Sequence, residues 1–247
     1  MAIEVFKRYE NKYLLTDEEF HRLFDQLLEH MELDDYNKEH SFYSICNIYF
    51  DTPQHTLIRK SIARPKYKEK LRLRAYGVPQ PGSKAYLELK KKVRGVVNKR
   101  RTALTLDEAY AFVQSGIKPE PKPYMNTQVL SEIQYFVQRY TLEPKVYLAY
   151  ERKALFSKES RNLRITFDTN IRSRRYDLRL EAGDHGEPLL ESGIWLMEVK
   201  AEKTIPLWLA RLLSEQRIFR TRFSKYGNEY RKYVANSYAI KEVVHHV

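Results

Sequence analysis

In the stretch KEKLRLRAY, residues 68–76, charged and apolar side chains alternate from Lys70 to Ala75. Successive side chains of a β-strand point to opposite faces of a sheet, so this stretch has one basic face and one apolar face. The stretch LELKKK, residues 87–92, begins with the same alternation. The charged face of the two stretches carries Lys70, Arg72, Arg74, Glu88 and Lys90. These two strands therefore predict a sheet that is apolar on one side and ionic on the other.

The same alternation recurs in four further stretches, and the ionic face of three strands carries the pattern Glu-x-Lys. The additional residues of the ionic face are Arg8, Glu10, Lys12, Tyr150, Arg152, Arg164, Thr166, Asp168, Glu198 and Lys200. An antiparallel sheet that shows one face to water gives the ordinary explanation of such a pattern. Solvent faces, however, usually mix Ser, Thr, Asn, Gln and Lys, whereas these faces repeat Glu, Lys and Arg. The repetition favours an enclosed ionic surface.

Periodicity and turn residues divide the chain into alternating elements of an α+β protein. Strands are predicted at about 4–15, 42–51, 66–77, 84–92, 95–104, 144–157, 161–173 and 193–201, and helices at 17–33, 106–115, 126–140, 206–216 and 225–238. The length of 247 residues suits one domain, residues 1–247, with a core at about 5–233 and a C-terminal tail at about 239–247. The Pro-rich stretch 118–124 is interpreted as a loop between two helices.

The eight strands predict an antiparallel β-barrel with helices packed outside and an interior wide enough for a small ligand. Basic groups gathered in such an interior repel one another unless an anion lies between them. Arg and Lys are the usual partners of phosphate oxygens, and a few carboxylates among them suit Mg²⁺ or Mn²⁺. The sequence therefore predicts a tunnel that holds a phosphate chain together with a divalent metal ion.

Composition agrees with this hypothesis without selecting it. The formal net charge is +12, which favours an anionic partner of any kind. The only cysteine, Cys46, lies in an apolar stretch, which excludes an internal disulfide and is typical of a reducing compartment. No stretch has the length and hydropathy of a membrane span, so we expect a cytoplasmic protein whose association with a membrane would depend on a partner protein.

Eight segments in order resemble one known group of proteins over about residues 5–233. They are YENKYLL, NIYFDT, KLRLR, LELKKK with the following KRR, YERKA, RITFD, MEVK and FSKYGNEY. Together they resemble the VTC domain, the catalytic domain of the vacuolar transporter chaperone polyphosphate polymerases, in the CYTH-like superfamily of triphosphate tunnel metalloenzymes. The resemblance implies an eight-stranded tunnel that takes ATP or another nucleoside triphosphate. The implied reaction transfers the γ-phosphate onto a polyphosphate chain with Mn²⁺ or Mg²⁺ as cofactor.

The resemblance also implies roles for individual residues. Those matching the basic residues that bind phosphate are Lys12, Arg72, Arg74, Lys90, Lys99, Arg152, Arg164 and Lys225, with Tyr150 and Ser224 as auxiliary polar contacts. Glu198 matches the carboxylate that holds the metal ion. We assign Arg72, Arg74, Arg152, Arg164 and Glu198 to catalysis, and add Glu88 and Glu10 to the metal ligands because they belong to the ionic face.

Three alternatives remain open. A triphosphatase or nucleoside triphosphatase would use the same tunnel, but the hydrolytic branch of the superfamily begins with Glu-x-Glu-x-Lys, and here Arg8 replaces the first Glu. A non-catalytic polyphosphate binder would keep the ligand and lose the reaction. A nucleic-acid binder would explain the net charge and the 19 tyrosines, but no nucleic-acid motif is visible.

Two further features have competing interpretations. Asp51, followed by Thr52 and Pro53, is interpreted as a turn or helix cap and is left out of the site. The cluster Arg172, Arg174, Arg175 and Arg179 suits either the mouth of the tunnel or a solvated basic edge.

Overall fold

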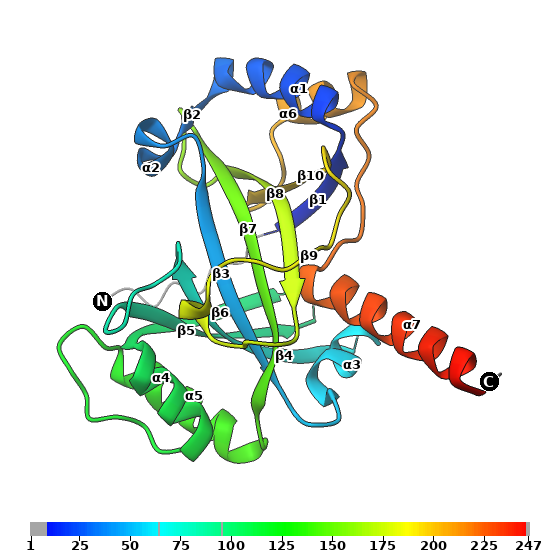
Figure 1. Ribbon diagram of the computed structural model, residues 1–247. Helices are drawn as coiled ribbons and strands as arrows, with labels where there is room; N and C mark the ends of the chain where they lie inside the picture. Colours follow the sequence, from blue (N-terminus) through cyan, green and yellow to red (C-terminus); the bar gives the residue numbers. More distant parts are fainter. Residues whose placement is uncertain (1–8, 64, 95, 246–247) are drawn as a thin grey trace.

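The computed structural model describes residues 9–63, 65–94 and 96–245. Its strands form one antiparallel sheet, in which eight long strands follow the order β1-β10-β8-β7-β3-β4-β5-β6 (Figure 1). Their bounds are β1 (Tyr9–Leu15), β3 (Tyr43–Asp51), β4 (Tyr67–Tyr76), β5 (Lys84–Val93), β6 (Val96–Thr105), β7 (Glu143–Ser157), β8 (Arg164–Arg174) and β10 (Trp195–Ala201). The eight predicted strands are thus confirmed, although residues 4–8 and Arg8 with them lie outside the described part.

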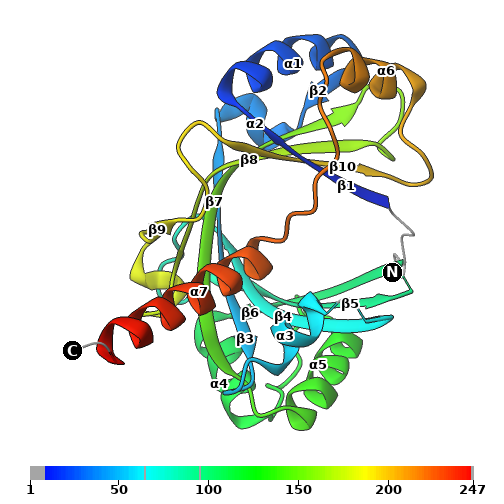
Figure 2. The same cartoon turned by 90° about the vertical axis from the view of Figure 1, so that its right-hand side faces the viewer.

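The sheet is strongly curved, with β1 and β10 at one end and β4, β5 and β6 at the other (Figure 2). The first strand pairs with the last, so that Lys12 lies opposite Glu198. Within the described ranges β1 and β6 are not paired with each other, so hydrogen bonds do not close the predicted barrel there. The curvature nevertheless gives the sheet a convex outer face and a concave inner face.

Two apolar cores lie on the convex face, where the alternation placed the leucines. Helices α1 (Asp17–His30) and α6 (Leu207–Glu215) cover one core, in which Phe20 stacks on Trp195 at 3.7 Å between ring centroids. Helices α4 (Leu106–Ser115) and α5 (Thr127–Arg139) cover the other, which contains the buried leucines of β4 and β5. In Figures 1 and 2 the two helix pairs lie beyond opposite ends of the sheet. The prediction of helices outside the sheet holds for both pairs.

A third apolar cluster lies on the concave face, which the sequence predicted to be ionic. Ile45 of β3 and Leu148 of β7 point inward there, and Ile58, Phe223 and Tyr226 pack against this cluster. The last three come from or precede α3 (Thr56–Ile62) and α7 (Lys225–His245), so these two helices cover the inner face and not the outer one. The prediction failed here because β3 and the start of β7 are apolar on both faces. Such strands need a packing layer on each side to bury their apolar side chains.

The remaining differences from the sequence analysis concern short elements and helix ends. The helix predicted to reach residue 33 ends at His30, and Met31–Leu33 form strand β2 beside β7. The short elements α2 (Asp35–Glu39), the 3-10 helix Leu180–Ala182 and strand β9 (Glu187–Pro188) were not predicted. Helix α7 continues to His245, beyond residue 238, because no Gly or Pro follows to end it. No helix in the described ranges is both long and apolar enough to span a membrane.

Candidate functional site

The charged side chains of the concave face gather around two buried carboxylates, Glu198 on β10 and Glu88 on β5. We call the groups around them the Glu198 cluster and the Glu88 cluster. The Glu198 cluster contains Glu10, Lys12, Arg152, Asp168, Glu198, Lys200 and Lys225. The Glu88 cluster contains Arg72, Arg74, Glu88 and Lys99. Strand pairing therefore brings together residues that are far apart in the sequence.

In the Glu198 cluster, each oxygen of Glu198 accepts from a lysine. Lys12 lies 2.9 Å from Oε1 and Lys200 lies 2.9 Å from Oε2, while Lys225 approaches Oε1 at 3.4 Å. Burial alone would raise the pKa of Glu198, but these surrounding charges hold it well below its ordinary value. Glu198 is thus an ionised carboxylate at neutral pH, although only 6% of its surface is exposed.

Asp168 on β8 is the second carboxylate of this cluster, and the structure buries it completely. The guanidinium of Arg152 donates two hydrogen bonds to it, from Nε at 2.6 Å and from a terminal nitrogen at 2.8 Å. Lys225 donates a third, from the first turn of α7. Burial raises the pKa of Asp168, but Arg152 and Lys225 lower it further, and the carboxyl stays ionised. Asp168 therefore fixes the positions of two predicted phosphate-binding side chains.

In the Glu88 cluster, one carboxylate holds cations from two neighbouring strands. Arg72 donates from Nε at 2.7 Å, and Lys99 donates at 3.0 Å to the other oxygen. Arg74 approaches at 3.9 Å. Burial would raise the pKa of Glu88, and the three nearby cations lower it well below its ordinary value instead. The three phosphate-binding residues predicted on β4 and β6, namely Arg72, Arg74 and Lys99, thus contact the same buried charge.

Polar side chains of β3 and β7 hold the arginines between the two clusters. Arg74 donates to the amide oxygen of Asn47 at 2.9 Å and to the hydroxyl of Tyr150 at 3.0 Å. Arg72 donates to the Tyr49 hydroxyl at 3.0 Å. Burial raises the pKa of Tyr150, but nearby cations, Arg74 first, bring it below its ordinary value. Tyr150 therefore lies among the residues that the sequence grouped with it.

Three further predicted residues lie apart from these contacts. Arg164 lies 3.4 Å from the Tyr43 hydroxyl and 3.5 Å from Asp34, and its Nε has no hydrogen-bond partner. Ser224 caps α7, because its Oγ accepts from the backbone N–H of Gly227 at 3.2 Å. Lys90 lies between Lys70 and Lys99 in the strand register and makes none of the ion pairs of either cluster.

Four residues of the site were not assigned by the sequence analysis: Asn47, Tyr49, Asp168 and Lys200. Asp168 and Lys200 already belonged to the ionic face through alternation, which was the available signal. Asn47 and Tyr49 gave none, because β3 lacks a charged face. Asp51, which the sequence interpreted as a cap, accepts from the backbone of Leu57 and Ile58 at 2.8 Å and caps α3.

The side chains of the arginine cluster at 172–179 form hydrogen bonds and ion pairs within the protein. Arg174 donates to the backbone carbonyls of Asp177, Arg179 and His185, and Arg175 forms a two-point ion pair with Glu229 at 2.7 and 2.8 Å. These contacts join the loop after β8 to α7. They favour a structural role over the mouth of a tunnel.

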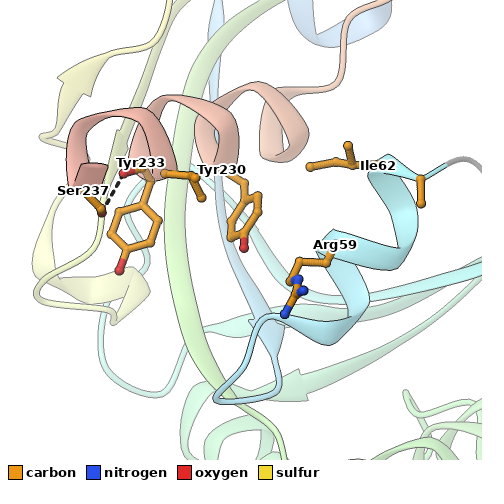
Figure 3. A pocket seen from close by; sticks show the side chains of 7 residues that line it. Arg59, Ile62, Tyr230, Tyr233 and Ser237 are labelled. Atoms are coloured by element: carbon orange, nitrogen blue, oxygen red, sulfur yellow. Dashed lines mark hydrogen bonds between the residues drawn. The ribbon is translucent and has the colours of Figure 1, made fainter. Parts of the chain in front are cut away.

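A pocket of about 670 Å³ lies between α3 and α7 (Figure 3), and its lining residues belong to neither cluster. Tyr230, Tyr233 and Ser237 of α7 line one side of it, and Arg59 and Ile62 of α3 line the other. Its lining includes a single charged side chain, Arg59. The groups suited to bind a polyanion belong to the concave face and not to this pocket.

The VTC domain family model matches residues 7–234. The chain belongs to the VTC domain family. That range contains every residue of the Glu198 and Glu88 clusters. No curated protein matches this VTC domain in sequence.

Two solved structures resemble the VTC domain described above. A candidate adenylate cyclase from Bacillus halodurans has 17% sequence identity and a TM-score of 0.53, over 88% of this chain and 95% of that chain. A candidate adenylyl cyclase from Hippeastrum, described as having a dominant triphosphatase activity, has 17% identity and a TM-score of 0.44, over 88% of this chain and 92% of that one. At such identity the likeness to the bacterial protein concerns the fold alone.

The carboxylates of the site suit a divalent cation only if a ligand completes its coordination. No group of three or more Asp, Glu, His or Cys side chains in the described part could hold a metal ion by itself. Glu10 and Glu198, however, both contact Lys12, at 3.3 and 2.9 Å. Mg²⁺ is often held by one or two carboxylates together with phosphate oxygens of a substrate. Glu88, the third predicted ligand, belongs to the other cluster.

Proposed function

We propose that this VTC domain is a metal-dependent phosphotransferase of the polyphosphate polymerase type. Its substrates would be ATP, or another nucleoside triphosphate, and a polyphosphate chain. One observation carries the proposal: the basic residues of the concave face outnumber the four carboxylates Glu10, Glu88, Asp168 and Glu198 that accompany them. Buried cations in excess need anions from elsewhere, and a chain of phosphates supplies several charges along a line.

The arginines are held in position before any ligand arrives. Arg152 is fixed by Asp168, and Arg72 is fixed by Glu88 and Tyr49. A cation that is already oriented loses little conformational freedom when it meets the phosphoryl group, and it neutralises charge without reorganisation during the reaction. This favours roles for Arg72, Arg74 and Arg152 as clamps on the β- and γ-phosphates.

The proposed reaction is an in-line displacement at the γ-phosphorus. An oxygen of the terminal phosphate of the chain forms a bond to that phosphorus. The bond to the oxygen that bridges the β- and γ-phosphates breaks, and ADP leaves with the electron pair. The chain grows by one phosphate, and no proton has to be transferred. The protein's task is therefore to position the two anions and to offset their repulsion, for which Lys12, Arg152 and Lys225 are well placed.

Glu198 and Glu10 would hold Mn²⁺ or Mg²⁺ together with phosphate oxygens. A bound divalent ion supplies positive charge to the transferring group and to the leaving phosphate. Lys12 and Lys200 already bind Glu198 and keep it ionised, which the carboxylate needs in order to act as a metal ligand. The assignment of Glu88 to the metal has less support, because the described cations on Glu88 form ion pairs with no second carboxylate, whereas Glu10 and Glu198 share Lys12.

Hydrolysis of triphosphate is the second candidate. Glu10 and Glu198 both contact Lys12, and two carboxylates that lie close together could position an attacking water molecule. Transfer and hydrolysis share the bound triphosphate and differ in the acceptor. A binder without catalysis would keep the same basic face. A cytoplasmic location, where ATP is available, and a partner in a membrane remain predictions.

Incubation with γ-labelled ATP and Mn²⁺ distinguishes these functions. We expect labelled polyphosphate on a gel that resolves chain length. Glu198→Gln should abolish turnover while tripolyphosphate binding remains measurable, and Glu202→Gln, at an exposed position after β10, should behave as the unsubstituted protein. Free labelled phosphate would identify a hydrolase, and binding without turnover would identify a binder. Full activity of Glu198→Gln would refute the role of Glu198.

A further inference from the structure

Three lysines lie side by side across the strands next to the Glu88 cluster. In the register of the sheet Lys70 of β4 is opposite Lys90 of β5, and Lys90 is opposite Lys99 of β6. The next row on the same face contains Arg72 and Glu88. Side chains that are directly opposite on one face lie close together, and like charges in such positions are destabilising. The row of lysines is therefore unfavourable unless something neutralises it.

Among the described residues, one end of this row forms an ion pair with a carboxylate. Lys99 forms an ion pair with Glu88 at 3.0 Å. Neither Lys70 nor Lys90 forms a hydrogen bond or ion pair with a carboxylate of the described residues, although the charge of Glu10 acts on Lys90. The Lys70 ammonium lies over the ring of Tyr226, 5.6 Å from its centroid. Lys70 and Lys90 are thus cations of the ionic face that form no ion pair with a described carboxylate.

The charges that act most strongly on Lys70 are all positive. Lys68 and Arg72 flank it on β4, Lys90 faces it from β5, Lys12 faces it from β1, and α7 contributes the ring of Tyr226. Burial and these four positive charges lower the pKa of Lys70 to about 7. Burial and the neighbouring positive charges therefore disfavour the charged form of Lys70 in the absence of a ligand.

We propose that Lys70 and Lys90 form a phosphate subsite, and that Lys70 takes up a proton when a phosphate group of the polyanion binds there. The inference rests on the proposed function in that the ligand is a chain of phosphates. Lys70 is not among the residues that the family resemblance assigned. A phosphate oxygen between the two ammonium groups replaces their repulsion by attraction, and this favours the charged form of Lys70.

Calorimetric titration with tripolyphosphate, without nucleotide or metal, tests the subsite. Repeating it in buffers of different ionisation enthalpy gives the number of protons taken up on binding. Arg is always charged, so Lys70→Arg should bind without the proton that Lys70 contributes. At about pH 8 the unsubstituted protein should take up close to one proton more than Lys70→Arg, and at about pH 6 the two should agree. Between about pH 6 and about pH 8, the affinity of the unsubstituted protein for tripolyphosphate should fall about tenfold relative to that of Lys70→Arg.

Two further variants complete the test. Lys60→Arg, at an exposed position of α3, should behave as the unsubstituted protein. Lys70→Met should bind tripolyphosphate more weakly at about pH 6, where the lost ammonium is fully charged in the unsubstituted protein. The pKa of Lys99 is also lowered, to about 8, by burial first, but Lys99 is present in every variant and cancels from the difference.

The outcomes separate this inference from the proposed function. Equal proton uptake by the unsubstituted protein and Lys70→Arg would overturn the subsite, as would unchanged affinity of Lys70→Met. If polyphosphate is synthesised but the proton difference is absent, the subsite alone fails. If the proton difference is present but no phosphate is transferred, the phosphotransferase proposal alone fails. If tripolyphosphate does not bind, both fail.

Discussion

Within the Glu198 cluster, Asp168 is the carboxylate that Arg152 and Lys225 share. Its carboxylate receives two hydrogen bonds from Arg152 and one from Lys225, and neither oxygen is exposed to solvent. Buried ion pairs contribute little net stability, but removing one partner leaves an uncompensated charge. The carboxylate of Asp168 therefore matters mainly as the counter-charge that keeps Arg152 and Lys225 in place without ligand.

We expect Asp168→Asn to lower the free energy of unfolding by about 3–5 kcal/mol in the absence of ligand, because Arg152 and Lys225 lose their shared anion. Tripolyphosphate should restore more stability to this variant than to the unsubstituted protein, since the ligand supplies the missing negative charge. Urea unfolding with and without tripolyphosphate measures both effects. Asp25→Asn, at an exposed position of α1, serves as the control. A loss equal to that of the control would contradict the role given to Asp168.

The sequence predicted which face each charged residue occupies but not which charges meet. Alternation along one strand decides the face, so Lys12, Arg72, Glu88 and Glu198 were placed correctly on the concave side. The pairing of Arg152 with Asp168 and of Lys200 with Glu198 depends on the register between strands that are distant in the sequence. Register depends on all the strands together, and no local pattern contains it.

At the scale of elements, one carboxylate joins α3 to α7. Asp51 ends β3, accepts hydrogen bonds from the first turn of α3 and accepts another from the Tyr226 hydroxyl at 3.0 Å. The ring of Tyr226 stacks on Tyr49 at 4.8 Å between centroids. Tyr49 in turn binds Arg72. The start of α7, which carries Lys225, is thereby fixed to the strand that positions the Glu88 cluster.

Tyr226→Phe should keep the stacking on Tyr49 and lose only the hydrogen bond to Asp51. Because the acceptor is a buried carboxylate, we expect the free energy of unfolding to fall by about 1.5–3 kcal/mol. Thermal unfolding measures the change, with Tyr135→Phe at an exposed position of α5 as the control. The same variant should also weaken tripolyphosphate binding, since Lys225 would be less firmly placed. Stability and affinity both equal to those of Tyr135→Phe would show that this contact does not anchor α7.

Elements with a repeating pattern were predictable, and those that depend on distant partners were not. The strands and the long helices have clear periodicity, and Thr16 and Thr105 mark the starts of α1 and α4 as capping residues. Helix α3 has no such signal, because His55 precedes it in a left-handed conformation and its N–H groups are capped from Asp51, the last residue of β3. The inner position of α7 follows from the apolar concave surface of β3 and β7, which appears only when the sheet curves.

At the scale of the whole molecule, the ionic face extends across the sheet from β1 to β6. The Glu198 cluster lies on β1, β10, β8, β7 and the start of α7, and the Glu88 cluster lies on β4, β5 and β6. Between them lie Lys70 and Lys90, with no fixed anion. A ligand with several phosphates in a row can contact both clusters and the lysines between them, whereas a single phosphate can contact one part only.

This arrangement predicts that length, and not charge concentration alone, determines how strongly a phosphate compound stabilises the protein. A ligand at about one hundred times its dissociation constant adds about 2.7 kcal/mol to the free energy of unfolding. For a chain of this size that corresponds to a rise of about 5–11 °C in the melting temperature. Tripolyphosphate should reach this shift at concentrations where monophosphate, at equal total phosphate and ionic strength, produces little change. Sodium chloride at the same ionic strength controls for screening, which weakens exposed charge interactions first. Equal shifts with tripolyphosphate and monophosphate would mean that the two clusters bind anions independently, and the concave face would then lack the continuous site that a phosphate chain requires.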